Sequence, residues 1–136
     1  MKTQISSPHL AQPNGHFSHA TLVDAPGKML FISGMTARAA DGSITGIGDI
    51  EAQTRQVCEN LKAACEAADA TLDDIVRVDV YVRNIEHFEV IHKVRREYFK
   101  APVPASTMVE VAKMVKPDYL IEISAIAVLA SPAVLP

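Results

Sequence analysis

The sequence predicts an α+β fold, with a single mixed β-sheet and two helices on one of its faces. Between residues 76 and 82, valine alternates with charged or aromatic side chains, the period of two that a half-buried strand requires. Over residues 49–69, apolar side chains recur in steps of three and four, as on an amphipathic helix. Residues 119–129 are largely apolar on both faces of a strand. Because two helices can cover only one face of the sheet, we expect neighbouring subunits to bury the other.

The N-terminal third is predicted from local turn signals. Residues 1–19 contain two prolines and an Asn-Gly pair, which indicates an irregular N-terminal arm. Residues 20–24 and 29–33 are short apolar runs separated by a Pro-Gly pair, which is typical of two antiparallel strands joined by a tight turn. Several glycines between residues 34 and 48 then indicate a long loop that leads into the first helix.

The later elements have capping and terminating signals. Asp49 can cap the first helix, and its negative charge suits the helix dipole. Asn84 is placed to cap a second helix over residues 85–100, which the following prolines end. Two β-rich runs, residues 106–111 and 119–129, complete the order strand, strand, helix, strand, helix, strand, strand.

Length and composition indicate a single domain over residues 1–136. A chain of 136 residues has the commonest size for one compact domain, and its 49% hydrophobic content is enough for a core. Aromatic residues make up only 5% and tryptophan is absent, so Val, Ile, Leu, Ala and Met must build that core.

The net charge and the lengths of the apolar runs limit the classes of partner that we expect. The formal net charge of -3 does not favour nucleic acid, and no apolar run reaches the roughly 18 residues that a membrane span needs. We therefore expect a cytoplasmic protein that binds neither membranes nor, as a default, nucleic acid. Cys58 and Cys65 are seven residues apart on one helix, about 10 Å along its axis, too far to form a disulfide. We expect reduced, buried thiols.

Three stretches of sequence carry a family resemblance. They are Phe31-Ile32-Ser33-Gly34; Ala52-Gln53-Thr54-Arg55-Gln56 with Asn60-Leu61; and Pro104-Ala105 and Val109-Glu110-Val111 with the run 121–128. Through them the chain resembles the Rid family of reactive intermediate deaminases, also called the YjgF family, over essentially its whole length. The resemblance implies a chorismate-mutase-like fold and a homotrimer with substrate sites in the clefts between subunits. It also implies hydrolysis of an enamine or imine to a carbonyl compound and ammonia, without metal or organic cofactor.

The resemblance also implies functional residues. Glu122 matches the glutamate that positions or activates water, and a carboxylate in an apolar strand can act as a general acid or base. The alternative is a structural role, in which the Glu122 carboxylate is held by backbone groups or by a basic side chain of a neighbouring subunit. The residues that match the substrate-binding cleft are Phe17, Ser33, Gly34, His92 and Met108.

Ser106 is the main departure from the family pattern. It stands where the family has an arginine that clamps the substrate carboxylate, and a hydroxyl group cannot form the bidentate, charge-assisted contact of a guanidinium. We expect a substrate other than 2-aminoacrylate, such as an aminomuconate-like compound, with Arg38 or His92 as substitute donors. Alternatively, Ser106 simply suits the start of a strand.

Other candidates have simpler interpretations. His16 and His19 lack a third ligand with suitable spacing, so we expect loop histidines and no metal. The cluster Lys93, Arg95 and Arg96 fits a solvated helix face that pairs with nearby glutamates better than an RNA-binding surface.

The preferred function is therefore an imine or enamine deaminase. The alternatives are a trimer that binds a small metabolite without turnover, in a regulatory role, and a ribonuclease, which the acidic balance disfavours.

Overall fold

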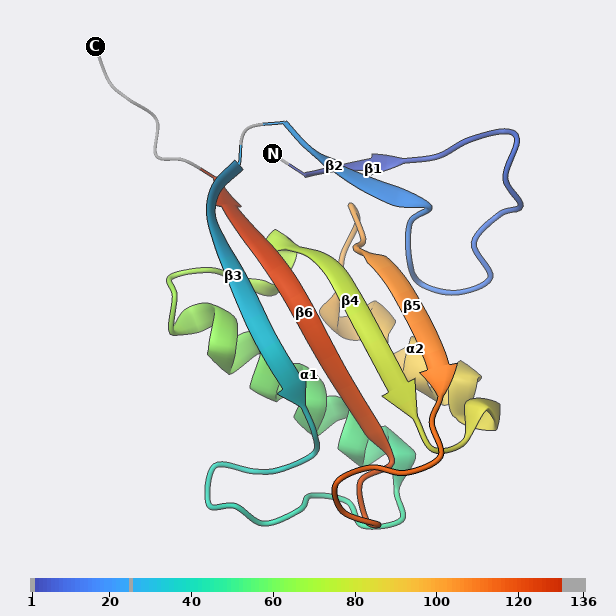
Figure 1. The fold of residues 1–136 in the computed structure, drawn as a ribbon, viewed down its shortest axis with the longest axis vertical. Helices are drawn as coiled ribbons and strands as arrows, with labels where there is room; N and C mark the ends of the chain where they lie inside the picture. Colours follow the sequence, from blue (N-terminus) through green and yellow to red (C-terminus); the bar gives the residue numbers. More distant parts are fainter. Residues whose placement is uncertain (1, 25, 131–136) are drawn as a thin grey trace.

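The computed structural model describes residues 2–24 and 26–130 (Figure 1). The strands are β1 (Lys2–Ile5), β2 (Ala20–Val23), β3 (Pro26–Met35), β4 (Ile75–Val82), β5 (Ala105–Glu110) and β6 (Ile121–Ala130). The helices are α1 (Ile50–Glu66) and α2 (Phe88–Tyr98), with single 3-10 turns η1 (Leu72–Asp74) and η2 (Ile85–His87). Within the described ranges, no helix is long and apolar enough to cross a membrane.

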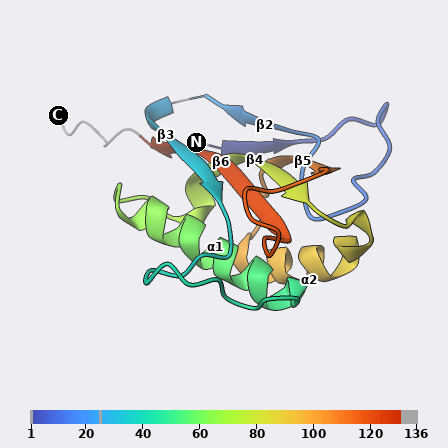
Figure 2. The same ribbon diagram turned by 60° about the horizontal axis from the view of Figure 1, so that its bottom comes forward.

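Four strands form one mixed sheet in the order β3-β6-β4-β5. β6 is antiparallel to both of its neighbours, whereas β4 and β5 are parallel. Both helices lie against the same face of this sheet, as Figure 2 shows. The predicted α+β class is therefore confirmed. β1 and β2 form a separate two-stranded sheet at one end of the molecule.

The core lies between the helices and the sheet. Each of the expected periodic patterns supplies one side of it. On β4, Val78, Val80 and Val82 are buried as predicted, whereas Val76 is half-buried because the register shifts there and Ile75 is buried instead. On the helix side, α1 buries Val57, Leu61 and Cys65. Asp49 caps α1 as predicted, its side chain accepting a hydrogen bond from the Ala52 N–H. Cys58 and Cys65 are both buried and free, as expected.

The N-terminal third differs from the prediction. Residues 20–24 and 29–33 do not form a hairpin, because β2 pairs with β1 and β3 pairs with β6. The Pro-Gly pair is not a turn between strands, since Pro26 is the first residue of β3, a position that needs no ladder N–H. The segment expected to be an irregular arm also contains a strand, β1.

The second helix is also divided differently. Asn84 accepts a hydrogen bond from the Glu86 N–H, so it caps the turn η2, and α2 begins only at Phe88. The helix ends at Tyr98, before the prolines.

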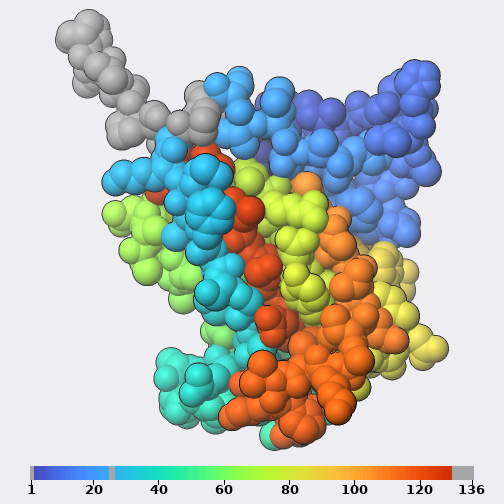
Figure 3. Space-filling view, in the orientation of Figure 1, coloured from blue at the N-terminus to red at the C-terminus, as the bar shows by residue number. Residues whose placement is uncertain are grey.

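The other face of the four-stranded sheet is open in the single chain. Figure 3 shows side chains of β3, β6, β4 and β5 side by side on this face, with no helix over them. Apolar side chains on this face are exposed to solvent: Met29 is 55% and Phe31 is 69% exposed. This is the face that we expect a neighbouring subunit to cover, and that expectation stays a prediction.

Candidate functional site

A small cavity lies between α2, β5 and the N-terminal loop. Its volume is about 170 Å³, and its lining consists of Asn14, Phe17, Phe88, His92, Arg95, Ser106 and Met108. The parallel pairing of β4 with β5 sets Ser106 beside Val78 and Met108 beside Val80, whose side chains are buried on the helix-covered face. Ser106 and Met108 therefore point toward α2, because alternate residues of a strand share a face.

The N-terminal loop brings Phe17 to this cavity. The adjacent Ser18 is buried, with its hydroxyl donating to the Val103 carbonyl at 2.6 Å and its N–H donating to the Pro104 carbonyl. These contacts hold the loop against the start of β5. They explain how a residue far from β5 in the sequence comes to line the same cavity as Ser106.

His92 is fixed in the cavity wall. The side chain is 2% exposed, and its Nδ1 accepts a hydrogen bond from the His16 N–H at 3.0 Å. Its ring stacks at a tilt on Phe88, with centroids 4.2 Å apart. Gly15 leaves the room for it, since a Cβ there would stand 2.5 Å from His92 Cε1. Burial, helped by the charge of Arg95, lowers the pKa of His92 to about 4. The ring is thus neutral near pH 7 and has Nε2–H as a donor.

Arg95 was expected on a solvated helix face, and that expectation is wrong. Its side chain is 1% exposed and lines the cavity, with Nη2 donating to Ser106 Oγ at 3.1 Å. Burial lowers the pKa of Arg95 to about 10, which still leaves the guanidinium charged near pH 7. The neighbouring Lys93 and Arg96 are exposed, and Lys93 pairs with Glu51 of α1 at 3.2 Å.

A second cluster lies where β3 ends beside β6. Glu122 follows the buried Ile121 and precedes the buried Ile123, so its side chain belongs to the open face of the sheet. Its carboxylate lies directly against Gly34, where a Cβ would collide with it. The exposed Ser33 precedes Gly34 on β3.

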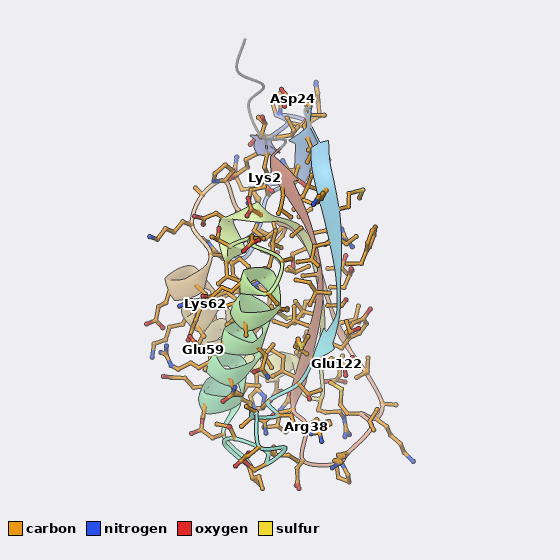
Figure 4. The ribbon with its side chains drawn as sticks, turned by 90° about the vertical axis from the view of Figure 1, so that its left-hand side faces the viewer. Lys2, Asp24, Arg38, Glu59, Lys62 and Glu122 are labelled. Atoms are coloured by element: carbon orange, nitrogen blue, oxygen red, sulfur yellow. The ribbon has the colours of Figure 1, made fainter. Side chains whose placement is uncertain are left out.

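Arg38 lies near this second cluster and away from Ser106. It lines a hollow of about 520 Å³ that Gly34 and Asn60 also line, whereas Ser106 lines the cavity at α2. Asn60 holds the Arg38 carbonyl with a hydrogen bond of 2.8 Å. Figure 4 shows Arg38 in the loop beyond the end of β3, with Glu122 beside that end.

The predicted residues thus divide into two groups within one chain. Phe17, His92, Ser106 and Met108 line one cavity, together with Arg95, for which the sequence pattern predicted a solvated helix face. Gly34 contacts Glu122 at the other group, with Ser33 and Arg38 close by in the sequence.

The remaining candidates are two histidines and two cysteines, and their contacts and burial indicate structural roles. His16 contacts the Phe99 carbonyl through Nε2, and His19 contacts the Ala11 carbonyl at 2.6 Å, so both histidines hold the N-terminal loop. Burial raises the pKa of Cys58 to about 12 and that of Cys65 to about 11, which disfavours the nucleophilic thiolate.

Comparisons with known proteins identify the family. The family described as Endoribonuclease L-PSP matches residues 8–129. A solved Yersinia pestis protein of the conserved Rid family has a TM-score of 0.85 and 34% identity, covering 94% of this chain and 98% of that one. The chain belongs to the Rid family.

Curated relatives agree with this assignment. A RutC family protein of Pyrococcus horikoshii is 40% identical over 127 residues, which are 93% of this chain and 98% of that protein. A 2-iminobutanoate/2-iminopropanoate deaminase of Dermatophagoides farinae is 34% identical over 94% of this Rid chain and 97% of that protein. The family resemblance seen in the sequence is thereby confirmed.

Proposed function

We propose that this Rid protein hydrolyses a reactive imine or enamine to a carbonyl compound and ammonia, with Glu122 as the general acid and base. The observation that supports this proposal most directly is the position of the Glu122 carboxylate, on a strand and directly against the backbone of Gly34. The missing side chain of Gly34 leaves the space that the Glu122 carboxylate occupies, so the carboxylate can lie close against the backbone of β3. A relative named as an imine deaminase at 34% identity supports the same chemistry.

In the proposed reaction, Glu122 accepts a proton from water as the water oxygen attacks the imine carbon. Glu122 returns this proton to the nitrogen, which completes a tetrahedral carbinolamine. Glu122 then accepts the hydroxyl proton of the carbinolamine and passes it to the nitrogen as the C–N bond breaks, so the C=O bond forms and ammonia leaves. An enamine enters the same route after protonation on carbon gives the imine. The overall change adds one water and releases one ammonia, so no redox partner is needed.

The proposed assembly is a homotrimer in which two neighbouring chains complete each site. Glu122 lies on the open face of the sheet, whereas Ser106 and His92 face the helices. A substrate that touches both groups therefore needs the Glu122 cluster of one chain beside the cavity of the next. With serine at position 106, the proposed substrate is larger than 2-aminoacrylate, such as an aminomuconate-like compound.

The test measures ammonia release from freshly generated imines and enamines, 2-aminoacrylate and aminomuconate among them. We expect catalysed release that falls by about 10² to 10⁴ fold in Glu122→Gln. Glu89→Gln serves as the matched control, because Glu89 is exposed on α2. Retained activity in folded Glu122→Gln contradicts the role of Glu122. Binding without turnover by the wild type favours instead the regulatory, non-catalytic alternative that the serine at position 106 suggests.

A further inference from the structure

Arg95 is a buried cation with spare hydrogen-bond donors. Of its guanidinium nitrogens, Nη2 donates to Ser106 Oγ at 3.1 Å and lies 3.5 Å from the His16 carbonyl. Nε and Nη1 are buried and have no hydrogen-bond partner within the part of the chain that the structure describes. Buried polar groups are nearly always satisfied, and unpaired donors on a charged group are costly.

No carboxylate of the described residues neutralises this charge. The ion pairs of the neighbouring cations, Lys93 with Glu51 and Arg55 with Glu97, are exposed pairs between α1 and α2. None of the ion pairs within residues 2–24 and 26–130 includes Arg95. Its side chain instead lines the 170 Å³ cavity, with Nη2 donating to Ser106 of the same lining. A buried cation that lines a cavity and has no carboxylate partner is expected to bind an anion from outside the chain.

The cavity chemistry defines that anion. The aromatic rings of Phe17 and Phe88 and the thioether of Met108 give it apolar walls. Ser106 and the neutral His92 add hydroxyl and N–H groups beside the guanidinium. Because the volume is below that of pockets for drug-sized ligands, the occupant is small. A carboxylate matches this site, because it accepts charge-assisted hydrogen bonds from guanidinium N–H groups.

We infer that Arg95 binds the carboxylate of a small organic acid in this cavity, with Ser106 and His92 as supporting donors. A cation carried by α2 thus does the work that the family resemblance assigns to an arginine at position 106. The inference that this acid is the substrate rests on the proposed function. Because Arg95 Nη2 is 3.1 Å from Ser106 Oγ, a carboxylate held by Arg95 would lie beside the Ser106 hydroxyl.

The first experiment measures binding of pyruvate, a probe with a carboxylate and an apolar end, by calorimetry on the full-length protein. We expect Arg95→Met to raise the dissociation constant at least about thirtyfold and Arg95→Lys about tenfold, because lysine keeps the charge but loses the planar set of N–H donors. Arg96→Met, an exposed neighbour on α2, serves as the matched control and should bind like the wild type. Pyruvate binding by folded Arg95→Met at wild-type strength overturns the inference.

A second experiment compares two ligands on the wild type, so that its binding comparison does not depend on a variant. In the wild type, methyl pyruvate should bind at least about thirtyfold more weakly than pyruvate, since the ester has no anionic carboxylate. In nuclear magnetic resonance spectra, pyruvate should shift the Nε–H signal of Arg95, which is identified by its disappearance in Arg95→Lys. Equal binding of acid and ester, or an unmoved Nε–H signal at saturation, contradicts the assignment.

The two proposals fail in different ways. Pyruvate binding that depends on Arg95, without ammonia release from any imine, leaves the anion site standing and removes the deaminase function. Ammonia release that depends on Glu122 but has an unchanged KM in Arg95→Met leaves the function standing and removes the anion site.

Discussion

The burial of His92 in the cavity wall makes the stability of the folded protein depend on pH in the acid range. It is buried beside Arg95, with Arg96 and His16 as further nearby bases, and burial is the main reason that its pKa falls to about 4. In the unfolded chain the ring titrates near its ordinary value of 6.5. Between these two values the unfolded state binds a proton that the folded state does not, so stability must fall as the pH falls.

We therefore predict that His92→Asn flattens the acid side of the stability profile. The wild type should lose about 2 to 3 kcal/mol through this group as the pH falls from 6.5 to 4, with the contribution fully present above 6.5. Asparagine can still accept the His16 N–H but does not titrate. Urea unfolding from pH 7 to pH 4 measures the effect, with the exposed His9→Asn as control. Equal slopes in His92→Asn and the wild type would contradict the prediction.

Arg95 shows what the sequence did not reveal at the level of single residues. A run of Lys93, Arg95 and Arg96 favours a solvated surface, since lysine and arginine are seldom fully buried. The available signal was the helical spacing, because Arg95 follows His92 by three residues and precedes Phe99 by four. Glu122, by contrast, could be selected from the family resemblance, although its contact with Gly34 could not.

At the level of elements, strong hydrophobic periodicity predicted β4 and α1 correctly, whereas the turn signals did not predict which strands pair. The alternation on β4 and the helical spacing on α1 report burial of a whole face, which the final fold must satisfy. A Pro-Gly pair reports only a local backbone preference. The same pair fits the start of β3 once the long-range pairing with β6 is available. The pairing of β1 with β2 joins residues that are between 15 positions (Ile5 with Ala20) and 21 positions (Lys2 with Val23) apart, and no local pattern specifies it.

Gln53 ties three segments together at the end of the molecule near the Glu122 cluster. Its buried amide donates to the Asp118 carbonyl at 2.8 Å and to the Gly46 carbonyl at 3.2 Å. Its carbonyl accepts from the Leu120 N–H at 2.9 Å, two residues before Glu122. One side chain of α1 therefore fixes the approach to β6.

We predict that Gln53→Ala costs about 2 to 4 kcal/mol of unfolding free energy, because it leaves buried backbone groups unpaired and opens a cavity. The catalysed rate should fall as well, since Glu122 loses its anchor. Urea unfolding and ammonia release measure the two effects, with the exposed Lys62→Ala of α1 as control. A Gln53→Ala protein as stable as Lys62→Ala would show that the anchor is dispensable.

At the level of the whole molecule, the two groups of candidate residues face opposite ways. The cavity with Arg95 is complete within one chain, between the sheet and α2. The Glu122 cluster lies on the open face, together with the exposed Met29 and Phe31. An open apolar sheet face is typical of a surface that another chain covers. The same contact that buries Phe31 would therefore also bring Glu122 to a neighbour's cavity.

We predict that the wild type has a mass about three times the chain mass of 14.7 kDa, and that Phe31→Asp is a folded monomer. A charge at this 69% exposed position is tolerated by the single chain but not inside an apolar interface. Light scattering and circular dichroism measure mass and fold. Ile47→Asp is the control, because Ile47 is 65% exposed in the loop before α1, away from the four strands.

The monomeric variant also separates the two groups of residues functionally. Phe31→Asp should lose catalysed ammonia release, because Glu122 no longer meets a neighbour's cavity. It should still bind pyruvate with the wild-type dissociation constant, because Arg95, Ser106 and His92 line a cavity within one chain. Full activity in the monomer would contradict a site shared between chains. Loss of pyruvate binding in a folded monomer would mean that the Arg95 cavity itself depends on the neighbour.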